Sequence, residues 1–169
     1  PNCSSNAQGA LLSKDQTKLV VGTQGTAGHF VIPDGITTIG AYAFQGNENL
    51  VRVTIPDSVT EIHGYAFRDC TNLTDVDFGS SLTMIDDSAF ENCVKLENVV
   101  LPDCVAEIGS RAFKSCESLT SFKLPEDLPW SSIPSNIFDG CSNLTQIVDN
   151  DSSYYGTDGQ NVYNWPYDT

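Results

Sequence analysis

The chain has 169 residues, of which 40% are hydrophobic, so it is long enough to form one domain with a core. Its 22 acidic and 8 basic residues give a formal net charge of −14 at pH 7. This charge disfavours nucleic acid, whose phosphates need Lys and Arg to neutralise them, and it disfavours adsorption to anionic membranes. No apolar run approaches the ~20 residues that cross a bilayer, so we expect no direct membrane insertion.

Residues 1–31 form an N-terminal segment that precedes the first of a series of repeats. Within it, residues 9–22 read GALLSKDQTKLVVG, which is two apolar stretches around a polar turn. Two such stretches predict a β-hairpin. Stacked repeats need a cap at each end, so we expect this hairpin to cover the first repeat.

Residues 32–148 contain five copies of one 23-residue unit, the last of which carries two extra residues near Pro129 and Trp130. Four positions of the unit are apolar in every copy. These columns are Ile32, Ile55, Phe78, Leu101, Leu124; Ile39, Ile62, Ile85, Ile108, Ile133; Phe44, Phe67, Phe90, Phe113, Phe138; and Leu50, Leu73, Leu96, Leu119, Leu144. Five copies in register predict a repeat architecture.

A unit of this length predicts one coil of a solenoid, because a single unit cannot bury its own apolar positions. Stacking places equivalent side chains over one another at the strand spacing of ~4.8 Å. Within a coil, residues 73–78 predict a short parallel strand whose side chains alternate inward and outward. Residues 59–62 predict a second short strand on the opposite wall, and residues 66–67 predict a single helical or 3₁₀ turn.

The strand pattern L-x-x-L-x-L resembles that of leucine-rich repeats. More narrowly, IPDSVTEIHGYAF..C..L, its copies and the lead-in GALLSKDQTKLVV…FVIPDGITTIGAYAF resemble the BspA-like leucine-rich repeats of bacterial and some protist surface proteins, over about residues 9–148. Commoner leucine-rich repeats have Asn or Cys, then Leu, where this chain has Ser81 and Thr83, with the apolar residue at Leu82. This departure fits the BspA-like subclass and argues against long convex helices.

The resemblance implies an α/β repeat solenoid, a right-handed leucine-rich-repeat coil with short parallel strands, single helical turns and five 23-residue repeats. It also implies a non-enzymatic, extracellular or cell-surface module for protein binding or adhesion. No catalytic, cofactor-binding or metal-ligating residue is carried over, because the family motif is structural. We expect a secreted monomer whose partner is an extracellular or host surface protein. A structural spacer that displays another domain from the cell envelope is the alternative.

The chain contains six cysteines, four of which share one column of the repeat: Cys70, Cys93, Cys116 and Cys141. Stacked side chains point the same way, whereas a disulfide needs them turned toward each other, so we expect buried, reduced thiols. Cys3 and Cys104 lie outside this column. No C-x-x-C pair gives the usual zinc spacing, and the two histidines, His29 and His63, occupy different columns.

In a solenoid the inward residues are committed to packing, so binding falls to the outward positions of the strand wall. These positions vary from copy to copy while the inward columns do not. The candidate protein-binding residues are Arg52, Thr54, Asp75, Asp77, Asn98, Val100, Ser121 and Lys123. They form a mixed polar set with no row of aromatic side chains, which favours a protein partner over sugars or bases.

Residues 149–169 leave the repeat and hold four of the six tyrosines. They predict an aromatic, acidic cap on the last coil, with a flexible tail as the alternative. Residues 149–160, DNDSSYYGTDGQ, partly match a calcium-binding loop. However, Tyr154 replaces the turn glycine and Gln160 replaces the bidentate glutamate, so no metal site is expected.

Overall fold

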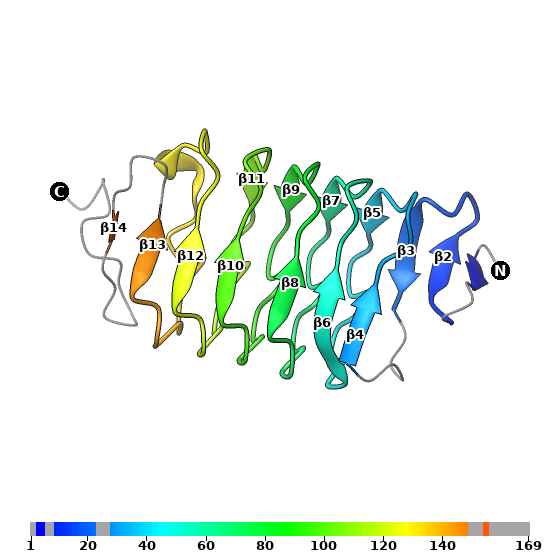
Figure 1. The fold of residues 1–169 in the computed structure, drawn as a ribbon, viewed down its shortest axis with the longest axis horizontal. Helices are drawn as coiled ribbons and strands as arrows, with labels where there is room; N and C mark the ends of the chain where they lie inside the picture. The colour runs from blue at the N-terminus through cyan, green and yellow to red at the C-terminus, as the bar shows by residue number, and fades with distance from the viewer. Residues whose placement is uncertain (1–2, 6–8, 23–27, 149–153, 156–169) are drawn as a thin grey trace.

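The computed structural model describes residues 3–5, 9–22, 28–148 and 154–155, which stack as successive coils (Figure 1). One side of the stack, the strand wall, is made of six strands that follow one another in chain order. They are β4 (Gly28–Val31), β6 (Leu50–Thr54), β8 (Asp75–Asp77), β10 (Asn98–Val100), β12 (Ser121–Lys123) and β13 (Gln146–Val148). The figure shows these strands side by side, each contributed by a new coil.

A second side, the short-strand face, carries a strand of two residues from each of the first four repeat units. Its members are β5 (Thr38–Ile39), β7 (Glu61–Ile62), β9 (Met84–Ile85) and β11 (Glu107–Ile108). They pair in parallel, with Ile39 beside Ile62 and Ile62 beside Ile85. The short strand expected in residues 59–62 is therefore present, and its isoleucines form a fully buried column.

Both ends of the stack add antiparallel strands. At the N-terminal end, β1 (Cys3–Ser5), β2 (Leu11–Ser13) and β3 (Lys18–Val21) pair in antiparallel order, and β3 then pairs in parallel with β5. At the other end, β14 (Tyr154–Tyr155) pairs antiparallel with β13. Each outermost coil thus has a further strand hydrogen-bonded to one of its sheets. The division at residues 31 and 148 stays a prediction.

The helical turn predicted at residues 66–67 is wrong, and the fold is a β-solenoid instead of an α/β one. The third side of each coil is a chain of turns, and the described residues contain one helical segment, the 3₁₀ turn η1 (Trp130–Ser132) at the two-residue insertion. A helix needs consecutive residues with negative φ, whereas Tyr65 and Asp69 have φ of 61° and 60°.

Backbone hydrogen bonds on this turn side explain why no helix forms. Alternate N–H groups donate within the coil, to the carbonyl three residues earlier, and the others donate to the next coil. The coil-to-coil bonds of the second repeat are Tyr65 N–H to Asp87 O (3.0 Å), Phe67 N–H to Ala89 O (2.8 Å) and Asp69 N–H to Glu91 O (2.9 Å). The turn side is therefore a third hydrogen-bonded wall, although it contains no strand.

The core is a single cluster built from the repeated apolar columns. The Phe44, Phe67, Phe90 and Phe113 rings stack nearly parallel, with centroids 5.0, 5.0 and 5.2 Å apart. In the last coil the stack ends, and Phe122 lies edge-on between Phe113 and Phe138. All four apolar columns are buried except at Phe78, which is half-buried.

The strand wall has one discontinuity, between β8 and β10, which we call the seam. Hydrogen bonding divides the wall there into a β4-β6-β8 sheet and a β10-β12-β13 sheet that also includes β14. In four coils the N–H that follows the strand donates to the next coil: Ile32 to Thr54 O, Ile55 to Asp77 O, Leu101 to Lys123 O and Leu124 to Val148 O. The equivalent bond from Phe78 N–H to Val100 O is missing.

We expect Phe90→Ala to lower the free energy of unfolding by about 3–5 kcal/mol, because it removes a ring from the middle of the stack and leaves a cavity. Chemical denaturation followed by circular dichroism measures this change. The control is Val100→Ala, whose wild-type side chain is 63% exposed and whose effect should stay within about 0.5 kcal/mol. A loss below about 1 kcal/mol for Phe90→Ala would contradict the central role of the ring stack.

Candidate functional site

The structure brings the eight candidate residues together in two outward-facing rows of the strand wall. One row runs His29, Arg52, Asp75 and, beyond the seam, Asn98, Ser121, Gln146; the other runs Val31, Thr54, Asp77 and then Val100, Lys123, Val148. Thr54, Ser121 and Lys123 are half-buried, and the other five candidates are exposed. The rows are formed as the alternation predicted, and their role in binding stays a prediction.

An ordered polar network covers the wall before the seam. Asp77 accepts hydrogen bonds from Arg52 Nη2 at 2.7 Å, Arg52 Nε at 3.1 Å and the Thr54 hydroxyl at 3.2 Å. His29 Nε2 lies 2.8 Å from the Thr54 hydroxyl oxygen. The Arg52 hydrogen bonds hold the pKa of Asp77 below its usual value, and Asp77 in turn raises the pKa of Arg52. An exposed ion pair contributes only ~0–1 kcal/mol, so this network orders side chains more than it stabilises the fold.

The wall beyond the seam has a different chemistry. Asn98 Oδ1 accepts hydrogen bonds from the hydroxyls of Ser121 at 2.7 Å and Thr120 at 3.3 Å. Val100 is the most exposed of the large apolar side chains, and Lys123 follows it in the same row. The candidate surface is therefore charged over β6 and β8 and mainly neutral over β10 and β12.

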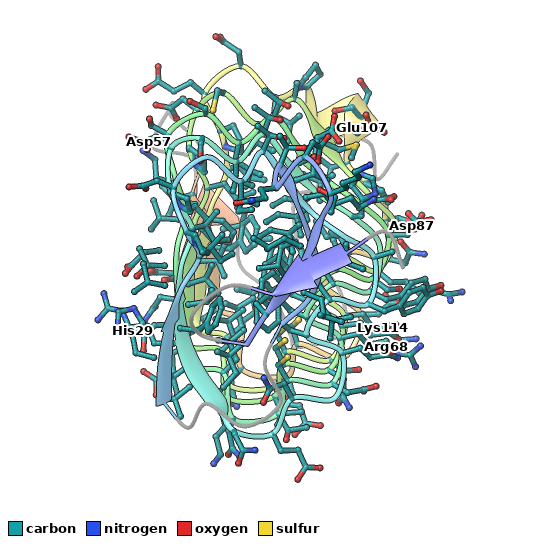
Figure 2. The ribbon with its side chains drawn as sticks, turned by 90° about the vertical axis from the view of Figure 1, so that its right-hand side faces the viewer. His29, Asp57, Arg68, Asp87, Glu107 and Lys114 are labelled. Carbon is teal, nitrogen blue, oxygen red and sulfur yellow. The ribbon has the colours of Figure 1, made fainter. Side chains whose placement is uncertain are left out.

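One exposed aromatic feature was missed by the sequence analysis, which looked for aromatics only on the strand wall. On the turn side the Tyr42 and Tyr65 rings stack at 5.1 Å with an interplanar angle of 1°, and the Arg68 guanidinium lies 5.5 Å from the Tyr65 centroid. Figure 2 shows Arg68 and Lys114 on the side of the solenoid away from His29. The available signal was the recurrence of tyrosine 23 residues apart.

This tyrosine column has left-handed backbone dihedrals that the coil imposes. The φ angles of Tyr42 and Tyr65 are 62° and 61°, and Ser88 and Arg111, one and two coils further on, have 54° and 58°. A non-glycine residue in this conformation costs roughly 1–2 kcal/mol. Because serine and arginine take the same conformation, the coil requires the backbone angle and not the aromatic ring.

The four column cysteines are free thiols in the core, as the sequence predicted. Each donates a hydrogen bond to the backbone carbonyl of the phenylalanine in the preceding coil. These bonds are Cys70 to Phe44 O (3.1 Å), Cys93 to Phe67 O (3.2 Å), Cys116 to Phe90 O (3.3 Å) and Cys141 to Phe113 O (3.1 Å). Burial raises the pKa of Cys70 to about 12 and moves those of Cys93 and Cys116 well above their usual value.

Asn47, in the cysteine column, and Cys104, outside it, differ from the buried thiols. Asn47, which replaces cysteine in the first coil, is buried, and its side-chain oxygen accepts the Asn49 N–H at 3.1 Å. Cys104 is an exposed free thiol whose Sγ contacts the Ser80 and Leu82 carbonyls at 2.8 and 3.0 Å. The five thiols that the structure describes therefore divide into a protected column and one exposed group.

No group of three or more His, Cys, Asp or Glu side chains that could hold a metal ion occurs in the described part of the chain. The histidines lie apart, and His63 Nε2 is 3.1 Å from Glu61 Oε2 on the short-strand face. The calcium-like segment 149–160 and the C-terminal region 149–169 lie outside the described residues except for β14. The described ranges also contain no helix that combines the length and the hydrophobicity of a membrane span.

Stacked coils, parallel strands and 23-residue columns define the class of leucine-rich-repeat solenoids. A family model described as "BspA type leucine rich repeat region" matches residues 26–155 in six copies. The chain therefore belongs to the BspA-type leucine-rich-repeat family. Six copies are one more than the five units counted from residue 32, and the strand wall likewise has six strands because β4 precedes that residue.

Solved structures with this fold come from several bacteria. The leucine-rich-repeat protein of T. pallidum is 32% identical, with a TM-score of 0.72 over 80% of this chain and 65% of its own. A leucine-rich cell surface protein from Faecalibacterium prausnitzii A2-165 is 29% identical, with a TM-score of 0.73 over 88% of this chain and 37% of its own. The pneumococcal vaccine antigen PcpA, at 22% identity and a TM-score of 0.74, shows the same fold over 88% of this chain and 36% of its own. A search of curated proteins found no match.

Thiol reactivity should separate Cys104 from the buried column. In a Cys3→Ser variant, which keeps five of the six cysteines, we expect a thiol reagent such as Ellman's reagent to label one thiol per native chain. All five should react in denaturant. Labelling of two or more thiols in the native protein, before unfolding, would contradict the burial of the column.

The raised thiol pKa values also predict a dependence of stability on pH. The folded state holds the Cys70 proton up to about pH 12, whereas an unfolded thiol loses it near pH ~8.5. Unfolding therefore releases protons in this range, and the contribution of the thiol to stability is complete below pH ~8.5 and is lost as the pH rises toward 12. Chemical denaturation of wild type and Cys70→Ala at several pH values measures this effect. The difference in the free energy of unfolding between the two proteins should shrink as the pH rises. A difference that stays constant with pH would contradict this linkage.

Proposed function

We propose that the chain is a non-enzymatic, extracellular module that binds or adheres to another protein through the strand wall. The observation that carries this proposal is the contrast between the two sides of each wall strand. Inward positions repeat the same apolar chemistry, whereas the outward rows change from Arg52 to Asp75 to Asn98 along the stack. A surface relieved of packing demands, and supported by an ordered backbone, suits recognition of an extended partner.

Two further observations bear on the location of the module and on the kind of partner it binds. The F. prausnitzii protein of similar fold is described as a cell surface protein. The net charge of −14 also disfavours the anionic surfaces of nucleic acids and membranes as ligands. We propose that the partner is an extracellular or host surface protein and that the module acts as a monomer.

A wall variant tests this proposal. Arg52, Asp75, Asp77 and Lys123 are changed together to alanine, which removes two acids and two bases. Wild type and variant are immobilised and screened by surface plasmon resonance against extracellular matrix and host surface proteins. We expect at least one partner whose affinity falls about tenfold or more in the variant, since truncated contact residues dominate binding energy.

A matched control removes the same charges from other sides of the solenoid, with Glu61, Glu107, Arg111 and Lys114 changed to alanine. Figure 2 shows Glu107 and Lys114 away from the side that carries His29. Affinity within about twofold of wild type is expected for this control. Full binding by the wall variant would rule out the strand wall as the site.

The second candidate is a structural spacer that displays another domain from the cell envelope. It is favoured by the three hydrogen-bonded walls, which join successive coils on three sides except at the seam and at the end of the short-strand face. Absence of binding to every protein of the panel, by wild type and both variants alike, would favour the spacer over the binding module.

A further inference from the structure

The seam between β8 and β10 differs from every other junction of the strand wall in the described coils. Along the wall, the bond from Glu97 N–H to Thr74 O joins this pair of coils at 3.4 Å, whereas the bond between Phe78 N–H and Val100 O is missing. A backbone donor and a backbone acceptor thus face each other at the seam without the bond that their equivalents make. Such groups are available to a strand or loop of another chain.

The residues at the seam explain why it is open. Four of the five coils have Ile or Leu followed by Pro at the end of the wall strand, whereas this coil has Phe78 and Gly79. A Cβ added at Gly79 would lie 2.3 Å from the Pro56 carbonyl oxygen, so its backbone sits closer to the preceding coil than any other residue could. At this point the chain packs closely against Pro56, the second residue after β6.

An apolar patch accompanies the missing bond. Val76 and Phe78 are half-buried, whereas their equivalents Val53, Val99, Ile55 and Leu101 are no more than 2% exposed. Val100, on the β10 side, is 63% exposed. Val76 and Phe78 face the core, where Phe78 lies edge-on to Phe90, and Val100 faces outward, so apolar side chains on both faces of the wall are partly or largely exposed where it is divided.

Acidic side chains outnumber basic ones around the seam. On β8, Asp75 and Asp77 lie near Arg52, whose hydrogen bonds go to Asp77. Asp75 accepts a hydrogen bond from the Thr74 hydroxyl at 2.6 Å and is exposed. Exposed Glu97 adds a carboxylate just before β10. The β8 side of the seam is thus acidic, and Lys123 lies on the opposite side, beyond Val100.

We propose that the seam is the docking point for a protein segment that places a bulky apolar side chain against Val100, beside the partly exposed Val76 and Phe78, with a Lys or Arg beside Asp75. The inference rests on the proposed protein-binding function and names the anchor within it. Apolar contact supplies the affinity, the carboxylates select the flanking cation, and the free backbone groups orient the segment.

An NMR titration with the peptide acetyl-Lys-Phe-Lys-amide tests the seam directly. We expect shifts of the backbone amide signals of residues 77–79 and 99–101, with an affinity about tenfold or more above those of two matched peptides. Acetyl-Lys-Ala-Lys-amide keeps the charges without the ring, and acetyl-Glu-Phe-Glu-amide keeps the ring with the opposite charges. Equal binding of the Phe and Ala peptides, or no shift at about 10 mM peptide, would overturn the proposal.

Two variants of the whole chain locate the binding. Val100→Ser should weaken the Lys-Phe-Lys peptide about tenfold or more, while Val31→Ser, an exposed valine in the same row on β4, should leave its affinity within about twofold. The double variant Phe78→Leu, Gly79→Pro gives this coil the residues of its neighbours. It should slow hydrogen exchange at residue 78 and abolish binding. Wild-type affinity in Val100→Ser or in a seam-closed double variant would overturn the proposal.

Failure of the seam inference can be distinguished from failure of the proposed protein-binding function. If the peptide docks at the seam while no protein of the panel binds, the seam inference stands and the proposed function fails. If a protein binds the strand wall of wild type and of Val100→Ser equally, the proposed function stands and the seam is not its anchor.

Discussion

The structure depends on one constraint, that each coil presents its backbone hydrogen-bonding groups to the next coil in the same register. The bonds repeat every 23 residues, for example from Phe44 N–H to Ala66 O and from Phe67 N–H to Ala89 O. This register places like side chains over one another about 5 Å apart, as the phenylalanine centroids show. Core, thiol column and outward rows all follow from it, because a residue's position in the unit decides its environment.

Much of the fold could be predicted because the buried positions recur as apolar columns of the 23-residue unit. The apolar positions recur at one place in every unit, and the short strands and the buried thiols each recur in four of the five units, and a single sequence shows such recurrence directly. The helical turn could not be excluded, because the pattern around Phe67 does not show where its N–H group goes. Polar residues at the left-handed positions, such as Asp69 and Asn92, are compatible with many turns, and only the coil-to-coil bond selects one.

The candidate site divides in the same way. Strand alternation was sufficient to place Arg52 and Asp75 outward, but the bonds from Arg52 to Asp77 cross 25 residues and need the register between strands. The tyrosine stack lies on a side whose outward positions follow no simple alternation. Phe78 and Gly79 were visible as departures from Ile-Pro and Leu-Pro, yet only the structure shows that they interrupt the wall. In a regular repeat, the positions that depart from the repeated residues are therefore the first places to look for function.

The thiol column has a consequence for the lifetime of the protein in an oxidising medium. While the chain is folded, its buried cysteines are inaccessible to oxidants and to one another's attack, because each Sγ is held on a carbonyl of the core. Unfolding releases all of them at once, and disulfides formed in that state would prevent return to the native register. The protein should therefore persist for as long as its barrier to unfolding holds, so that kinetic stability, more than the equilibrium free energy, sets how long it survives in such a medium.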